Sequence, residues 1–369
     1  MGGRAFLATL GPGLFPRIPL PVYNALKNRL LPRLQALYRR AIVPREAPEK
    51  LTFGDLDILV TGPRPSNLTS GQTDVPHTIL RDVLGAQCYP GEWEALNLGK
   101  EEEEIRQAAG GQDVFYQVDV NTCVDEAEHE RTAFFHGYGD LGMIMCVVAR
   151  NADPALVLGE KGLRLSLPPQ PRFELSQSLD DITKFMGWSM ETWKAGFRTN
   201  REAFEWVGSS RFFNPQGFRT HGEGIPKVSK QRIQFMYTEF VQWVAEKAAN
   251  TPLETQHNNP AMTVEERQLA FREHALVYFN KKQDYEAMVH KQSERARLKK
   301  VFNSSTVRQW TCLGQDWKAL KLVMDTVRKE LDGDAGILKL YDELGTSGVK
   351  RFVLEVQKQL SLASTTMNK

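Results

Sequence analysis

The sequence predicts an α+β protein in which a first part of mixed strands and helices precedes a helical C-terminal region. Two segments, Phe53–Val60 and Val114–Val120, have the composition and alternation of β-strands. After Thr220 the apolar residues recur almost entirely at helical spacing, and Lys230–Ala248 carries them on one face. At 369 residues, the chain is long enough for two or three domains.

Composition and charge exclude several classes of protein. Hydrophobic residues make up 41% of the chain and charged residues 25%, which is typical of a folded globular protein rather than a disordered one. The 47 Lys and Arg nearly balance the 45 Asp and Glu, so only local clusters can indicate a nucleic-acid partner. The four cysteines form no CxxC pair, which favours a reducing, intracellular compartment, either nucleus or cytoplasm. No run approaches the ~18–20 apolar residues of a membrane helix, so no membrane partner is expected.

The first 45 residues are basic throughout. They contain eight Lys or Arg and no acidic residue, and Val22–Tyr38 has the apolar spacing of a helix that Pro32 would bend or interrupt. We interpret residues 1–45 as a basic helical arm of the folded protein. A mitochondrial transit segment is the alternative, although serine is absent and proline is frequent.

Further elements follow from periodicity and turn residues. His77–Leu84 and Leu141–Arg150 are expected to be helices, the second one buried, whereas Gln87–Leu98 is either strand or irregular. Glycines at 159 and 162 predict a hairpin within Leu156–Leu167. Further along, Thr263 and Glu266 have the spacing of a helix capping box. The remaining expected helices are Ser178–Met186, Met190–Gly196, Asn200–Val207, Asp316–Leu331 and Gly348–Leu360.

The most informative pattern is a set of three aspartates on the two predicted strands. Asp55 and Asp57 are two residues apart, so both carboxylates point to the same face of the first strand. Asp119 lies between two valines in the second strand, and the three carboxylates converge if the strands are neighbours. Three converging carboxylates repel one another unless cations neutralise them, and oxygen ligands suit Mg²⁺ or Mn²⁺. The alternative is a solvent-facing edge strand or a turn-capping pair, which the apolar residues after Asp57 disfavour.

These strands resemble the catalytic strands of the DNA polymerase beta-like nucleotidyltransferases, and most closely the palm of the family X polymerases. Phe53–Pro63 is similar to their Gly-Asp-x-Asp strand, and Gln117–Val120 to the strand that carries their third aspartate. Phe134–Tyr138 resembles the aromatic pair and Thr-Gly-Ser turn that follow. Order and spacing agree from Arg39 to Leu167 and imply a mixed sheet with helices on one side.

The resemblance implies roles for particular residues. The three aspartates would bind Mg²⁺ (or Mn²⁺), with Asp119 also close to the attacking hydroxyl. The residues that it implies for nucleotide binding are Gly54, Arg39, Arg40, His136, Gly137, Tyr138 and Lys161.

The chain departs from the family at the phosphate cradle. The family places Gly-Ser or Gly-Gly ahead of the paired aspartates, whereas alignment here puts Ala36 and Leu37 at that position. His136 and Tyr138 replace Thr and Ser of the family turn, so the sugar pocket should differ. The family's DNA-binding lyase domain is not recognisable in the N-terminal segment, which argues against a gap-filling repair polymerase.

The resemblance and the helical spacing of the later residues together give a domain plan. Residues 46–168 would form the nucleotidyltransferase-like catalytic domain, residues 169–225 a small helical module, and residues 226–369 a helical C-terminal domain. The expected activity is Mg²⁺-dependent transfer of a nucleoside monophosphate from a nucleoside triphosphate to a hydroxyl, such as a nucleic-acid 3′ end.

Two alternatives remain. One is a catalytically degenerate protein of the same fold that binds a nucleotide, a nucleic acid or another protein. The other is a nucleic-acid-binding module that uses the basic arm and the helical stretch His290–Lys300. The sequence leaves the acceptor open: a nucleic-acid end, a protein side chain, a small molecule or a second nucleotide.

Overall fold

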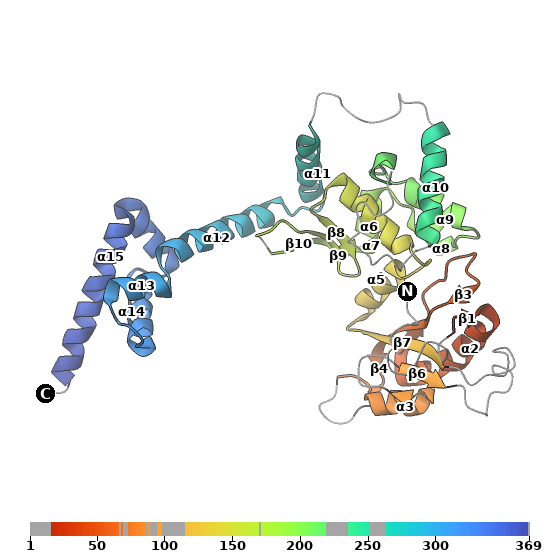
Figure 1. Cartoon of the computed structure of the whole chain (residues 1–369), viewed down its shortest axis with the longest axis horizontal. Helices are drawn as coiled ribbons and strands as arrows, with labels where there is room; N and C mark the ends of the chain where they lie inside the picture. Colours follow the sequence, from red (N-terminus) through yellow and green to blue (C-terminus); the bar gives the residue numbers. More distant parts are fainter. Residues whose placement is uncertain are drawn as a thin grey trace. The chain divides into compact units, whose positions relative to one another are not determined.

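The computed structural model has a mixed α/β architecture with a helical C-terminal region (Figure 1). It describes residues 16–65, 68, 73–85, 87–88, 94–97, 115–169, 171–218, 235–250 and 263–367. The chain divides into two compact units, Met1–Phe279 and Asn280–Lys369. This division does not fall at the expected boundary after residue 225, and the helices around residues 240 and 270 belong to the first unit.

The first unit is built on a five-stranded mixed sheet. Its strand order is β2-β4-β7-β6-β5, in which β4 and β7 are parallel and the other neighbours are antiparallel. The strand expected over Phe53–Val60 is split in two. Thr52–Phe53 (β3) pairs with Ile18–Pro19 (β1), and the sheet strand begins only at Leu56. The sheet strands are β2 (Tyr38–Ile42), β4 (Leu56–Pro63), β5 (Gln87–Cys88), β6 (Glu94–Asn97) and β7 (Phe115–Cys123).

One face of this sheet is covered by two expected helices, α2 (Leu20–Leu37) and α3 (His77–Leu84). Pro32 lies inside α2 without ending it. The apolar stripe of α2 packs on alternate residues of β4 and β7 in a continuous buried cluster. The members of that cluster include Leu26, Leu30, Leu34, Leu56, Ile58, Val60, Leu80 and Val118.

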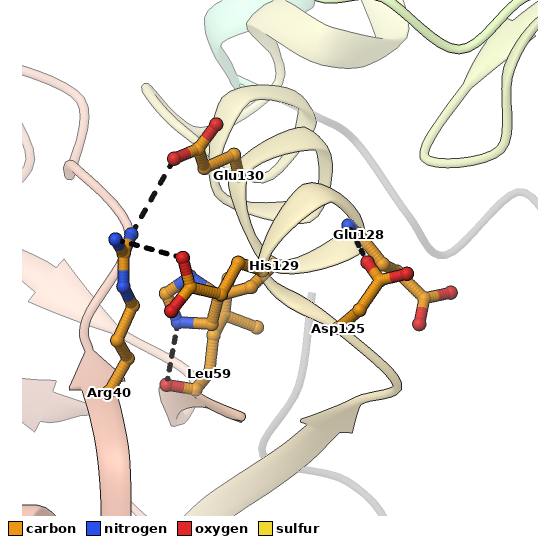
Figure 2. A network of polar contacts seen from close by, with 7 residues as sticks. Arg40, Leu59, Asp125, Glu128, His129 and Glu130 are labelled. Carbon is orange, nitrogen blue, oxygen red and sulfur yellow. Dashed lines mark hydrogen bonds and ion pairs between the residues drawn. The ribbon is translucent and has the colours of Figure 1, made fainter. Parts of the chain in front are cut away.

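The opposite face carries a helix that the sequence analysis did not predict, α5 (Glu126–Phe135). In the sheet register Arg40 is opposite Thr61, so both side chains project to the face that also carries Asp57. Helix α5 contacts β4 and β7, and Arg40 reaches it through ion pairs (Figure 2). Helices therefore lie on both faces, and the expectation of helices on one side is wrong. The sequence does mark the start of α5, because Asp125 is a favourable N-cap residue and its side chain accepts a hydrogen bond from the Glu128 N–H.

The remainder of the first unit follows the expected order. The expected hairpin joins β8 to β9, and Gly162 at its turn has φ +78°, where an added Cβ would lie 2.2 Å from the Ser176 carbonyl oxygen. Both hydrogen bonds of the predicted capping box at Thr263 are present. The elements are α6 (Leu141–Ala152), β8 (Leu156–Gly159), β9 (Gly162–Leu165), β10 (Phe173–Ser176), α7 (Leu179–Met186), α8 (Met190–Ala195), α9 (Asn200–Gly208), the 3-10 helix η3 (Pro215–Phe218), α10 (Phe235–Asn250) and α11 (Val264–Tyr278).

The second unit consists of helices packed around an apolar core. They are α12 (Lys282–Val301), α13 (Ser304–Thr311), α14 (Trp317–Glu330) and α15 (Asp334–Met367). Gly345 has non-helical backbone angles and divides α15 close to the predicted helix start at Gly348. In the described part of the chain, no helix is both long and apolar enough to cross a membrane.

Candidate metal centre

The three predicted aspartates lie together on the sheet. Asp57 and Asp119 are register partners on the parallel strands β4 and β7, and Asp55 directly precedes β4. Each residue offers one carboxylate oxygen, and these three oxygens lie within 4.8 Å of one another. Parallel pairing produces this convergence, because partners on neighbouring strands project to the same face of a sheet.

Burial makes this cluster of negative charge unfavourable without a cation. Burial and then the charge of Asp55 raise the pKa of Asp57 to about 6. Burial also raises the pKa of Asp119 to about 7, and the charges of Asp57 and Asp55 add to this effect. A divalent cation would offset the repulsion, and a set of three carboxylates fits Mg²⁺ or Mn²⁺.

Gln117 is a neighbour of the triad that the sequence analysis missed. Its side-chain amide donates to both carboxylate oxygens of Asp119, at 2.9 and 3.0 Å. These hydrogen bonds favour the charged form of Asp119 and oppose the rise in its pKa. Strand alternation could have identified this residue, because it precedes Asp119 by two positions and shares its face.

The segment between β2 and β4 places another carboxylate close to the triad. Glu46 accepts a hydrogen bond from the Tyr23 hydroxyl and forms an ion pair with Lys50 at 2.6 Å. The Tyr23 ring stacks on Phe53 with their centroids 3.8 Å apart. The charge of Glu46 contributes to the raised pKa of Asp57, so this segment is part of the electrostatic surroundings of the triad.

His136, one of the expected substrate-binding residues, interacts electrostatically with the triad. It caps the C-terminus of α5, and its Nε2 lies 2.6 Å from a carboxylate oxygen of Glu160 at the β8–β9 turn. This hydrogen bond raises the pKa of His136 and lowers that of Glu160. His136 and Asp57 are near enough that each alters the pKa of the other.

The other expected nucleotide contacts differ in their surroundings. Tyr138 is buried, and its hydroxyl accepts a hydrogen bond from Arg45 at 2.6 Å. Gly137 packs against Trp193. Lys161 is exposed beside Glu160, and Gly54 lies in the bend immediately before Asp55.

Arg39 and Arg40 are not brought to the triad. Arg40 is paired with Glu130 at 3.5 Å, as Figure 2 shows, and with Glu126 at 3.1 Å. Its register partner Thr61 is four residues beyond Asp57, about 13 Å along the strand. The Arg39 side chain instead packs against Gly62.

Ala36 and Leu37 align with the family's phosphate cradle, but the backbone at Leu37 and Tyr38 forms hydrogen bonds within the fold. The Tyr38 N–H bonds to the Leu34 carbonyl at the end of α2, and the Leu37 carbonyl accepts from the Arg64 N–H. Tyr38 is opposite Pro63, about 20 Å along the strand from Asp57. The backbone of this segment therefore offers the triad no phosphate cradle.

No model of a known protein family matches the chain, and no curated protein is significantly similar to it.

Proposed function

We propose that the protein is a Mg²⁺-dependent nucleotidyltransferase that transfers a nucleoside monophosphate from a nucleoside triphosphate to a hydroxyl. The observation that carries this proposal is the convergence of the Asp55, Asp57 and Asp119 carboxylates on two parallel strands. The resemblance of both strands to the nucleotidyltransferase palm supports it.

Each aspartate has a role in this reaction. Asp55, Asp57 and Asp119 would hold Mg²⁺, and when bound the ion would stabilise the negative charge that develops on the phosphates. The acceptor oxygen bonds to the α-phosphorus while the bond from that phosphorus to pyrophosphate breaks. Asp119 accepts the hydroxyl proton, and Gln117 holds its carboxylate in position.

Metal binding is the first test, because it needs no knowledge of the acceptor. We expect Mn²⁺ to bind wild-type protein and the Asp55→Asn/Asp57→Asn variant to lose this binding, as measured by electron paramagnetic resonance. Asp82→Asn is the matched control, because Asp82 is exposed and pairs with Arg81 outside the triad. Equal Mn²⁺ binding by wild type and the triad variant would contradict the proposal.

Nucleotide binding and transfer are tested next. A nucleoside triphosphate at about 100 times its Kd stabilises a protein by about 2.7 kcal/mol, so we expect a Mg²⁺-dependent rise of the melting temperature by several degrees. Radiolabelled nucleotides then show transfer to nucleic-acid ends, proteins or small hydroxyl compounds. The triad variant should show neither the rise nor the transfer.

A second candidate is a descendant of the same fold that binds nucleotide or another macromolecule without transferring a nucleotidyl group. The observations that favour it are the engaged backbone at Leu37–Tyr38 and the ion pairs that occupy Arg40. This candidate predicts metal-dependent nucleotide binding without release of pyrophosphate for any acceptor. Pyrophosphate release that requires all three aspartates would exclude it.

The second unit offers a surface for a nucleic-acid acceptor. Residues 280–369 contain 17 Lys or Arg and 11 Asp or Glu, a net charge of +6. Lys291, Arg295 and Lys299 are exposed at every fourth residue of α12. We expect RNA or DNA to bind more weakly as salt rises, and changing all three residues to Gln should reduce the slope of that dependence. Salt-independent binding would argue against a nucleic-acid acceptor.

A further inference from the structure

Arg131 is a buried cation without a carboxylate partner. It lies on α5, is only 8% exposed, and its Nε donates to the Glu160 carbonyl at 2.9 Å. Within the described residues it forms no ion pair, and its two Nη groups have no hydrogen-bond acceptor but are not among the fully buried, unpartnered atoms, so they remain accessible. Arg272 shows the usual arrangement, because the buried Asp153 accepts from its Nε at 2.9 Å and from an Nη at 3.1 Å. The guanidinium of Arg131 therefore has donors that no protein acid occupies and that an anion entering from solvent can reach.

A cavity of about 730 Å³ lies beside Arg131 within the first unit. The end of β2, helix α5, the start of α7 and helix α8 form its walls, and the aspartate triad is not part of them. Its volume is in the range of small-molecule sites. The charged side chains on its walls are Arg40, Arg45, Arg131, Lys194, Glu130 and Asp180, four positive against two negative, which leaves a net charge of +2.

Two of these cations are occupied by the protein itself. Arg40 pairs with Glu126 and Glu130, as Figure 2 shows for Glu130. Arg45 donates to the Tyr138 hydroxyl and to the carbonyls of Trp193 and Lys194. Arg131 and the exposed Lys194 are therefore the cations that remain for a ligand.

The other lining residues include the polar His129, Gln177 and Ser178, and an apolar part of the wall is formed by Trp193, Met190 and Phe134. An aromatic ring and a thioether can contact a flat or apolar group of a ligand. The cavity thus combines a buried cation with an apolar wall, and this combination suits a molecule that has an anionic end and an organic body.

We propose that this cavity binds a small organic phosphate, with the phosphate at Arg131 and Lys194 and the organic part against Trp193 and Met190. The planar guanidinium can donate two parallel hydrogen bonds to a phosphate, which is the partner that this geometry favours. The inference does not depend on the proposed nucleotidyl transfer, because the cavity and the triad share no residue.

The test uses 5′-AMP as probe, with adenosine and inorganic phosphate as comparisons, in EDTA so that the triad holds no metal. Binding is measured by isothermal titration calorimetry on wild type and on the Asp55→Asn/Asp57→Asn variant. We expect both proteins to bind 5′-AMP equally and to bind adenosine and inorganic phosphate more weakly. The Arg131→Met variant should bind 5′-AMP about tenfold or more weakly. Lys194→Gln, which alters an exposed residue, should show a smaller loss.

The control for charge is Arg198→Gln, because the Arg198 side chain is 90% exposed and lies outside the cavity. It should bind 5′-AMP as wild type does. If Arg131→Met fails to fold, the affinity for 5′-AMP is measured on Arg131→Lys and Lys194→Gln instead, and both should bind it more weakly than wild type. Affinity that is unchanged in Arg131→Met and Lys194→Gln, or no binding of 5′-AMP at millimolar concentration, would overturn the proposal. Equal affinity for inorganic phosphate and 5′-AMP would overturn the assignment of the apolar wall.

Discussion

The two compact units differ in the polar and charged side chains that they bury. In the second unit the described core is apolar, and its buried polar side chain, Thr311, donates to the Val307 carbonyl within its own helix. In the first unit the buried side chains include Asp119, His129, Arg131 and Asp153. Burying a charge is costly unless an opposite charge or a ligand offsets that cost. The groups available for binding and chemistry are therefore concentrated in the first unit.

Within the first unit, the buried charges fall into two kinds. Asp153 has a protein partner in Arg272, and this pair connects α11 to the segment after α6. Asp119 and Arg131 have no oppositely charged side chain against them in the described structure. The paired charges hold the fold together, and the charges without a partner mark the two sites that we propose.

The largest change in the free energy of unfolding should come from removing one partner of the buried Arg272–Asp153 ion pair. We expect Arg272→Met to lower the free energy of unfolding by about 3–5 kcal/mol, because Asp153 would be left buried and unpaired. Arg131→Met should change it by about 1 kcal/mol or less without ligand, since it removes an unpaired charge and one hydrogen bond. Urea unfolding measures both values. Equal decreases in the free energy of unfolding would contradict the prediction that Arg272 is part of a structural ion pair and Arg131 is not. The double variant Arg272→Met/Asp153→Asn should recover part of the loss.

Removing apolar volume from the second unit should also be costly while leaving the triad intact. Leu320 is 2% exposed in the core of α12–α15. We expect Leu320→Ala to destabilise that unit by about 2–5 kcal/mol in urea. Mn²⁺ binding at the triad should not change. Leu322→Ala is the control, because Leu322 lies on the same helix but is 54% exposed. Lost Mn²⁺ binding in Leu320→Ala would mean that the triad depends on the second unit.

The triad should make the metal-free protein less stable as pH rises. The pKa of Asp57 is raised to about 6 and that of Asp119 to about 7, mainly by burial, so the folded protein holds more protons than the unfolded chain between about pH 4 and pH 7. Its free energy of unfolding therefore falls through this range. At pH 8, Asp119→Asn should be more stable than wild type by on the order of 1–3 kcal/mol. Thermal unfolding in EDTA tests this, and Asp82→Asn should follow the wild-type profile.

The smallest expected effect concerns His136. Its hydrogen bond with Glu160 raises its pKa, so Glu160→Gln should lower that pKa, as measured by NMR titration of the ring. The stability gained from this pair is present below the usual histidine pKa and is lost as pH rises through the raised value. It should be small, because the Glu160 side chain is half exposed. An unchanged His136 titration in Glu160→Gln would mean that the pair does not form in solution.

Local patterns in the sequence predicted much of the fold. The helices at 77–84 and 141–150, the hairpin at 156–167 and the capping box at Thr263 depend on spacing, turn residues and caps within a few positions. The three aspartates were identified in the same way, because strand alternation assigns each to a face. Helix α5 was missed because its apolar residues do not form one clear stripe, although Asp125 signals its start.

By itself, the sequence determined where most helices and the two aspartate-bearing strands lie, since these depend on local propensity and periodicity. Only the tertiary structure decided which residues each side chain contacts. The parallel pairing of β4 with β7 brought Asp119 to Asp57, whereas the register of β2 directed Arg40 to α5 and away from the triad. The structure alone also placed Arg131 beside a cavity without an ion pair to any described acid. Register and packing join residues far apart in the chain, and the energies that select them belong to the whole fold rather than to any short segment.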